Sequence, residues 1–213
     1  MITIPTGDFT GLLADVIPFA STDDEIPSVN CVRLEWSGYR LAALSTDRYR
    51  VGISEWEPGD LGKGEAVQDD LFTDWGGADE AWRITVALDD AKELVKVFKL
   101  GEKEWGCPLI IDYEPGRDRL KVVRARETGH SAITVIAEGT GAEFPDVRAL
   151  LAKNDALEEV TSLAYTPKLL ADFGKVRPRG PMEMRFTGRE GLTHVSIGER
   201  FHGAIMPARL GEG

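Results

Sequence analysis

The sequence is poor in the features that mark secreted, membrane and metal-cluster proteins. Its 213 residues include only two cysteines, Cys31 and Cys107, which are too far apart in sequence to suggest a disulfide scaffold or a zinc cluster. The apolar runs are a few residues long, far short of the roughly 20 needed to span a bilayer. The start, MITIPTGDF, lacks the basic and apolar regions of a signal peptide. We therefore expect a cytoplasmic protein with reduced thiols and no membrane partner.

Signals for catalysis are also scarce. The Gly-Lys pair within 59–64 has neither the spacing nor the hydroxyl of a phosphate-binding loop. The three histidines have no carboxylate or cysteine at metal-ligand spacing. We expect no catalytic residue, cofactor or metal. A metal-dependent enzyme using Asp69, Asp70 and Asp74 is an alternative, but an acidic solvated loop fits these residues better because nothing rigid frames them.

The net charge of −11 is unevenly distributed along the chain. Between Glu55 and Glu80 there are nine acidic residues and one lysine, so this stretch alone carries −8. The remaining sequence is close to balanced, and the overall charge therefore does not exclude DNA as a partner. The segment 57–80 is rich in glycine and has no hydrophobic period, which predicts an exposed insertion.

Hydrophobic periodicity divides the chain into three similar stretches, each predicted to run β-α-β-β-β. The first has a strand at 1–5, a helix from Asp8 that Pro18 ends, and strands at 29–36, 39–45 and 49–56. The second has a strand at 82–88, a helix capped by Asp89 and Asp90, and strands at 108–113, 119–126 and 131–139. The third has a strand at 160–165, a helix with Pro167 in its first turn, and strands at 182–188, 193–198 and 202–210.

This repetition predicts an α+β protein built from one supersecondary unit packed against copies of itself. Two units make a complete domain at 1–150, which carries the acidic insertion 57–80. The third makes a half domain at 158–210.

Lysines recur on the polar sides of the second and third helices. Lys92, Lys96 and Lys99 fall at i, i+4 and i+7, opposite the apolar stripe of their helix. Lys168 and Lys175 repeat the i, i+7 spacing. This pattern fits an ordinary solvated face or a surface that follows the phosphates of duplex DNA without reading its bases.

Three short motifs resemble landmarks of a known family. They are Thr46-Asp-Arg-Tyr-Arg-Val51, Glu143-Phe-Pro-Asp-Val-Arg148 and Met206-Pro-Ala-Arg-Leu210. In this order they resemble the bacterial DNA polymerase III beta subunit, the DNA sliding clamp. Residues 1–150 resemble that family's middle domain, and 158–210 resemble the second half of its last domain.

The resemblance implies a DNA-clamp-like fold, with antiparallel sheets outside and helices on one face. It implies a sliding clamp or processivity factor that encircles duplex DNA and binds DNA polymerase and other clamp-binding peptides, with a clamp loader as a possible further partner. The alternative is a regulator or decoy that binds replication proteins without encircling DNA. The implied peptide cleft consists of Leu12, Thr46, Tyr49, Arg50, Val51, Pro145, Leu150, Met206, Pro207, Ala208, Arg209 and Leu210.

The chain departs from the family in ways that bear on assembly. Ala208 stands where the family usually has a larger methionine, and the first helix carries Asp8 and Asp15 but no basic residue. The third unit lacks a partner unit, so we expect Leu169, Leu170 and Phe173 to form an oligomer interface with another chain. Family rings contain twelve units, so three per chain implies a homo-oligomer, either a dimer or a tetrameric ring.

Overall fold

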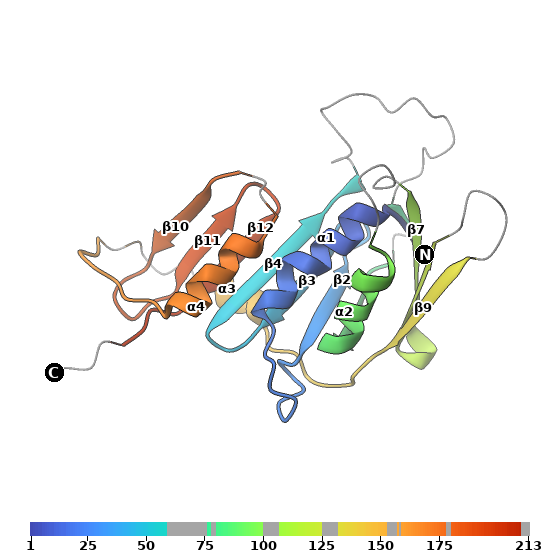
Figure 1. Ribbon diagram of the computed structural model, residues 1–213, viewed down its shortest axis with the longest axis horizontal. Coiled ribbons are helices and arrows are strands. Elements are labelled where there is room, and N and C mark those ends of the chain that lie inside the picture. Colours follow the sequence, from blue (N-terminus) through green and yellow to red (C-terminus); the bar gives the residue numbers. More distant parts are fainter. Residues whose placement is uncertain are drawn as a thin grey trace.

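The computed structural model describes residues 1–58, 76–77, 80–99, 107–124, 132–152, 157, 159–177 and 180–209. Within these ranges, the helices of the repeated units cover one face of antiparallel sheets, which confirms the predicted α+β class (Figure 1). The larger described sheet has seven strands in the order β10-β11-β12-β4-β3-β2-β6. The smaller has five in the order β5-β1-β7-β8-β9. Most of the acidic segment 57–80, and with it the prediction of an exposed insertion, lies outside the described residues.

The first two units follow the expected order of elements. Unit one contains β1 (Ile2–Pro5), α1 (Thr6–Val16), the 3-10 helix η1 (Ile17–Phe19), β2 (Cys31–Trp36), β3 (Leu41–Thr46) and β4 (Arg50–Trp56). Unit two contains β6 (Trp82–Ala87), α2 (Leu88–Val97), β7 (Pro108–Glu114), the 3-10 helix η4 (Pro115–Arg117), β8 (Arg119–Arg124) and β9 (Ile133–Glu138). The two-residue strand β5 (Gly76–Gly77) precedes it.

The third unit departs from the expected order. It contains α4 (Pro167–Ala171), the 3-10 helix η5 (Asp172–Lys175), β10 (Met182–Phe186), β11 (Thr193–Ile197) and β12 (Phe201–Ile205). The predicted strand at 160–165 is wrong, because these residues join no strand ladder in the described part of the chain. The predicted last strand is too long: it ends at Ile205, before Pro207, which has no N–H to donate to a ladder.

Helix ends follow the local sequence with one exception. Pro18 ends α1 as expected, and Pro167 lies in the first turn of α4. The predicted capping role of Asp89 and Asp90 is wrong, because α2 begins at Leu88 without a side-chain cap. Both carboxylates lie instead in the first turn, where their negative charge interacts favourably with the positive end of the helix dipole.

The first two units exchange their opening strands and share one core. Strand β1 of unit one pairs with β7 of unit two, and β6 of unit two pairs with β2 of unit one. Helices α1 and α2 cover the resulting layer (Figure 1). Phe9, Leu94 and Trp36 are among the fully buried side chains of this core. The exchange therefore joins the two units through two strand pairings and a shared core.

The third unit extends the sheet of the first, because β12 pairs antiparallel with β4 from Phe201↔Ser54 to Ile205↔Arg50. The ring of Phe173 packs against Phe19 of unit one with centroids 4.8 Å apart, and Phe19 lies 5.4 Å from Phe201.

This packing corrects the predicted oligomer interface. Phe173 is 2% exposed and already has a partner within the chain, and Leu169 and Leu170 pack partly buried against the same cluster. The reason is that unit three packs on η1 of unit one as well as on its own sheet. Phe173 therefore cannot form the expected contact with another chain.

The outer face of strands β2 to β4 is covered by a segment between units two and three. Helix α3 (Val147–Leu151) is capped by Asp146, whose carboxylate accepts from the backbone N–H of Ala149 at 2.9 Å. Phe144 and Val147 pack against a cluster that includes buried Cys31. Burial raises the pKa of the Cys31 thiol to about 11, and neither Cys31 nor Cys107 forms a disulfide in the described part of the chain.

Candidate partner-binding surface and DNA-facing helices

The turn between β3 and β4 is held by its own side chains. The Thr46 hydroxyl donates to the Arg50 carbonyl at 2.6 Å, and Asp47 Oδ1 accepts from the backbone N–H groups of Tyr49 and Arg50 at 3.0 and 2.8 Å. Arg48 has φ 76°, in the left-handed region. This turn leaves the Tyr49 side chain 56% exposed.

The Arg50 side chain points away from the exposed Tyr49 side chain, toward the helices. Its guanidinium donates to Asp47 Oδ2 at 2.8 Å and to Asp172, which begins η5. It also donates to the carbonyls of Leu169 and Pro18 at 2.9 and 3.1 Å. Arg50 is 5% exposed, so the expectation that it lines an open cleft is wrong. It instead joins unit one to unit three.

A second ion pair joins the same two units, with the acidic residue in unit one and the basic residue in unit three. Asp15 of α1 accepts from the backbone N–H of Arg177 and from the Ser54 hydroxyl, each at 3.0 Å, and lies 3.7 Å from Arg177 Nε. The Arg177 guanidinium donates to the Gly7 carbonyl at 3.1 Å and lies against Gly11, where a Cβ would collide with it. The acidic residues of α1 are therefore used within the chain.

The structure brings some of the predicted cleft residues together and buries others. Met206 donates its backbone N–H to the Tyr49 carbonyl at 2.9 Å, and its side chain is 47% exposed. Leu150 packs partly buried against the cluster that contains Cys31 and Val51. Of the remaining predicted cleft residues, Pro145 and Arg209 are exposed, Pro207 and Ala208 half-buried, Leu12, Thr46 and Val51 buried, and Leu210 outside the described residues.

Leu12 belongs to the core between the sheets and cannot touch a ligand, which corrects its prediction. Among the exposed predicted cleft residues, Tyr49 and Met206 are joined by a backbone hydrogen bond, and we call them the Tyr49–Met206 surface.

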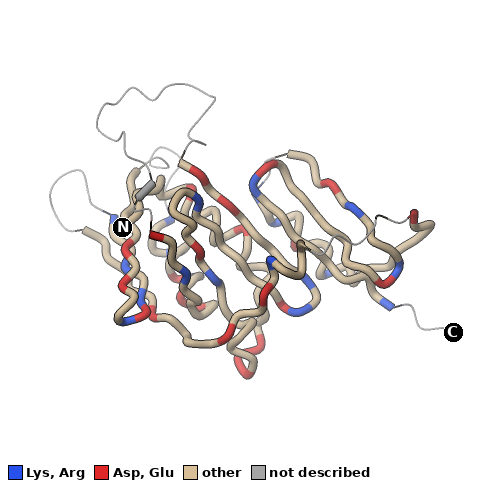
Figure 2. The backbone as a smooth tube through the Cα atoms, turned by 180° about the vertical axis from the view of Figure 1, so that it is seen from behind, with Lys and Arg blue, Asp and Glu red and all other residues tan. Residues whose placement is uncertain are grey.

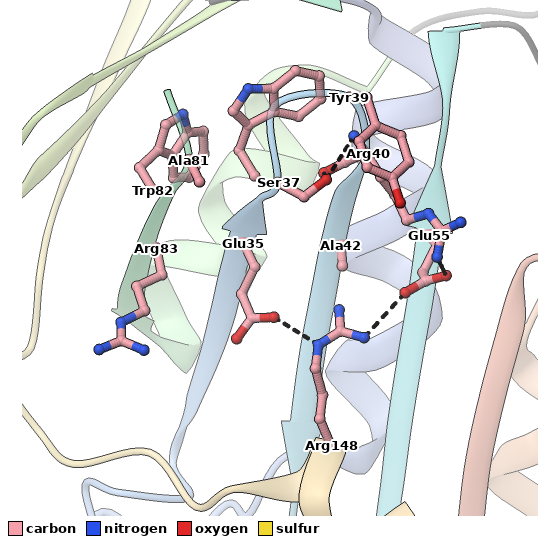
Figure 3. A pocket seen from close by; sticks show the side chains of 11 residues that line it. Glu35, Ser37, Tyr39, Arg40, Ala42, Glu55, Ala81, Trp82, Arg83 and Arg148 are labelled. Atoms are coloured by element: carbon pink, nitrogen blue, oxygen red, sulfur yellow. Dashed lines mark hydrogen bonds and ion pairs between the residues drawn. The ribbon is translucent and has the colours of Figure 1, made fainter. Parts of the chain in front are cut away.

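Sequence reasoning missed a polar hollow on the outer face, with a volume of about 630 Å³ (Figure 3). Arg148 of α3 points across the sheet and bridges Glu35 and Glu55 at 2.8 and 3.3 Å. Arg40 pairs with Glu55 at 2.9 Å. Burial alone would lower the pKa of Arg148, but the two carboxylates raise it. A neighbouring hollow of about 500 Å³ includes Pro145. Glu35 and Glu55 both lie opposite Ala42 of β3 and so share one face of the sheet, and strand alternation was the available signal.

The five predicted DNA-facing lysines are all exposed and lie on α2, α4, η5 or just beyond them. They are Lys92, Lys96, Lys99, Lys168 and Lys175. Two have acidic partners, since Lys92 pairs with Asp89 at 2.8 Å and Lys175 with Asp172 at 2.5 Å. Figure 2 shows the opposite side of the molecule, where residues of both signs are spread along the backbone.

Among the described residues, no group of three or more histidine, cysteine, aspartate or glutamate side chains is placed to hold a metal ion. The acidic residues Asp69, Asp70 and Asp74 lie outside them. No helix in the described ranges is long and apolar enough to cross a membrane.

Two units with exchanged opening strands, and antiparallel sheets with the helices of the units on one face, define a clamp-like fold. The solved structures that the chain resembles are of that class. A DNA polymerase III beta subunit from Thermotoga maritima matches with a TM-score of 0.72 and 15% identity, over 99% of this chain and 66% of that one. A putative beta subunit from Eubacterium rectale gives 0.74 and 10%, over 98% and 65%. A DNA polymerase sliding clamp from Pseudomonas aeruginosa gives 0.71 and 13%, over 98% and 65%.

Sequence comparison adds a shorter match. A beta sliding clamp from Micrococcus luteus is 37% identical over 60 residues, which is 27% of this chain and 19% of that protein. No family model matches the chain. The resemblance to the bacterial sliding clamps is thus confirmed at the level of the fold, and the chain spans just under two thirds of the length of the solved structures.

Proposed function

We propose that the protein is a DNA sliding clamp, a processivity factor without catalytic activity that encircles duplex DNA and holds a polymerase on it. The supporting observation is that α1, α2 and α4 lie on the same face of a sheet that continues from unit one into unit three (Figure 1). Copies arranged around a duplex would present these helices to DNA and their sheets to the outside.

The electrostatics of the helix face support contact with phosphates rather than with bases. The five exposed lysines are the proposed phosphate contacts of this face, where exposed Asp89 and Glu93 of α2 lie among them. Asp8 and Asp15 are not free to repel DNA, since they lie 3.8 Å from Arg200 and 3.7 Å from Arg177 respectively. Each phosphate contact made by a lysine releases a condensed counterion, which makes binding salt-dependent and independent of sequence.

The Tyr49–Met206 surface is the proposed site for the peptides of a polymerase and other clamp-binding proteins, a clamp loader among them. A tyrosine and a methionine offer large, adaptable apolar contacts, which are typical anchors of a protein interface. Half-buried Leu150, Pro207 and Ala208 and the exposed Pro145 and Arg209 are proposed as its surroundings, with Leu210 beyond them.

Retention on DNA tests the encircling mechanism. The protein should stay on a nicked circular plasmid at a salt concentration that strips it from the same plasmid after linearisation. Replacing Lys92, Lys96 and Lys99 by alanine should weaken DNA association and reduce the slope of log K against log salt by about 0.9 per lost phosphate contact. Replacing Lys121, on the sheet strand β8, is the matched control and should change neither value. Equal loss from circular and linear DNA would contradict encirclement.

A regulator or decoy that binds replication proteins without encircling DNA is the second candidate. The observation that favours it is the pairing of Lys92 and Lys175 with acidic neighbours, in a chain of net charge −11. In that case peptide binding would persist while retention on circular DNA would be absent.

A further inference from the structure

The first two units follow one rule for the strand that opens each of them. Strand β1 runs directly into α1 and pairs with β7, the first strand after the helix of the other unit. Strand β6 runs directly into α2 and pairs with β2, again the first strand after the other unit's helix. An opening strand therefore never pairs within its own unit in these two cases.

The third unit has a segment in the place of an opening strand and a strand that could pair with one, but neither is paired in this way. Residues 160–165 precede α4 as an opening strand would, yet they form no strand. Strand β10 is the counterpart of β2 and β7, yet it ends the seven-stranded sheet, with no strand on its outer side among the described residues. One free opening segment and one free edge thus occur in the same unit.

The opening segment has the side-chain pattern of the two opening strands. Those strands bury apolar side chains two and four residues before the helix: Ile4 and Ile2 before Thr6, and Val86 and Ile84 before Leu88. Counting back from Pro167, the same positions hold Tyr165 and Leu163. Tyr165 already points to the helix side of the sheet, since its hydroxyl lies 2.6 Å from Thr193 Oγ1.

The free edge has the matching pattern. Pro181 precedes Met182 and Met184 as Pro108 begins the strand containing Leu109 and Ile111. Met182 and Met184 lie opposite Ile197 and Val195, two members of the buried core, so they face the helix side. Met182 is nevertheless 48% exposed. The register of β1 on β7, applied here, sets Tyr165 opposite Met182 and Leu163 opposite Met184.

We propose that a second copy of this chain completes the third unit: residues 161–166 of each copy pair antiparallel with β10 of the other. In two copies related by a two-fold axis, the opening segment and the β10 edge of each copy both gain a partner strand. A single chain leaves both unpaired. The segment 161–166 is uncharged, and Glu183 and Arg185 balance each other on β10, so like charges do not oppose the pairing.

The backbone of the segment has an edge available for this pairing. The Ala164 carbonyl accepts from the Ala208 N–H at 2.7 Å on one side. In an extended segment, neighbouring residues direct their N–H and C=O groups to opposite edges, so those of Leu163 and Tyr165 face the other side. Leu163 is half-buried and belongs to none of the described core clusters. The exchange therefore removes no core contact of Leu163.

A disulfide between the copies tests the register. In a background with Cys107 replaced by serine, the pair Leu163→Cys and Met184→Cys should give a covalent dimer of twice the chain mass on mild oxidation. The matched control combines Leu163→Cys with Glu183→Cys, which puts the two thiols on opposite faces and should give none. No covalent dimer from the first pair would overturn the proposal. Cross-linking through Met184→Cys alone would overturn it too, because that result means that β10 pairs with β10.

Sedimentation across a concentration series tests the association without cysteines. The unmodified chain should be a dimer, and Leu163→Asp should raise the dimer dissociation constant on the order of 100-fold, because each copy would bury an unpaired carboxylate. Leu157→Asp, at a residue that is 67% exposed, is the control and should leave it unchanged. Circular dichroism would verify that both variants are folded.

A chain that is monomeric at every concentration would contradict the strand exchange. So would a dimer whose dissociation constant is unchanged by Leu163→Asp. The inference depends on the repeat geometry and not on DNA binding. Loss of DNA retention with the dimer intact would contradict encirclement and not the strand exchange. Loss of the dimer would contradict the strand exchange whatever the result on DNA.

Discussion

Arg50 is the buried cation between two carboxylates at the junction of units one and three, which the pairing of β12 with β4 also joins. Replacing it by alanine would leave Asp172 and Asp47 without their guanidinium partner in a nearly dry site. Removing one member of a buried ion pair typically costs about 3–5 kcal/mol. We expect Arg50→Ala to lower the free energy of unfolding by that amount in urea denaturation.

Arg48, two residues earlier in the same turn, is the matched control. Its φ of 76° is costly for a side chain with a Cβ and free for glycine. Arg48→Gly should therefore stabilise the protein, by roughly 1 kcal/mol. Similar losses from both variants would mean that the turn, and not the ion pair, is what Arg50→Ala disrupts.

Asp172 gives this junction a pH dependence. Burial alone would raise the pKa of its carboxyl, but hydrogen bonds from Lys175 and Arg50 lower it below its ordinary value. A lowered folded-state pKa means that the contribution is complete above the unfolded value of about 3.9 and is lost as pH falls through the folded value. Stability should therefore decline below about pH 4, and Asp172→Asn should flatten this decline.

Asp90 provides a control of opposite sign. Burial, with repulsion from Glu93 and Asp89, raises the pKa of Asp90, so the folded protein gains stability as that carboxyl is protonated. Asp90→Asn should therefore make the acid decline steeper. Urea titrations between pH 7 and 2 measure both slopes, and equal slopes in the two variants would contradict the assignment.

Most strands and helices could be predicted from the period of apolar residues, because burial on one face is a local property of the sequence. Strands β2, β3 and β4 begin within two residues of their predicted starts. Which strands pair is not local. The run at 160–165 alternates like β6, but it lacks the partner strand that the other unit supplies to β6. The Thr-Asp-x-x-Arg pattern likewise gave no sign that Arg50 meets Asp172, 122 residues away.

The turn before β4 and the end of β12 meet at the Tyr49–Met206 surface, and this junction carries a prediction on partner binding. Tyr49→Ala combined with Met206→Ala should reduce the affinity for a clamp-binding peptide from a polymerase by at least about tenfold, since two exposed anchors are removed. Fluorescence anisotropy with a labelled peptide measures it. Tyr39→Ala is the matched control, because Tyr39 is 61% exposed and lines the outer hollow instead. If that variant lost the same affinity, the peptide site would lie on the outer face.

At the scale of the whole molecule, the chain is a layer of sheets whose two ends differ. Strand β10 ends the seven-stranded sheet, and strand β9 ends the five-stranded sheet. Between them, the ion pairs Arg50–Asp172 and Asp15–Arg177 and the pairing of β12 with β4 join unit three to unit one. Strands β6 and β5 also end their sheets, but β10 and β9 lie on opposite sides of the molecule (Figure 1).

A closed ring needs a second contact besides the exchange at β10, and β9, on the opposite side of the molecule, is the edge we test (Figure 1). On this edge strand Ile136 is 47% exposed, whereas neighbouring Ala137 is 1% exposed. If dimers joined through β9 make a four-chain ring, Ile136→Lys should stop assembly at the dimer, because a lysine on an edge strand discourages pairing with another edge. The variant should keep the covalent dimer formed by Leu163→Cys and Met184→Cys, yet be lost from circular DNA as readily as from linear DNA. Light scattering with and without DNA distinguishes dimer from tetramer. Thr134→Lys tests the same edge on the same face, so a ring that tolerates both lysines would close through some other surface.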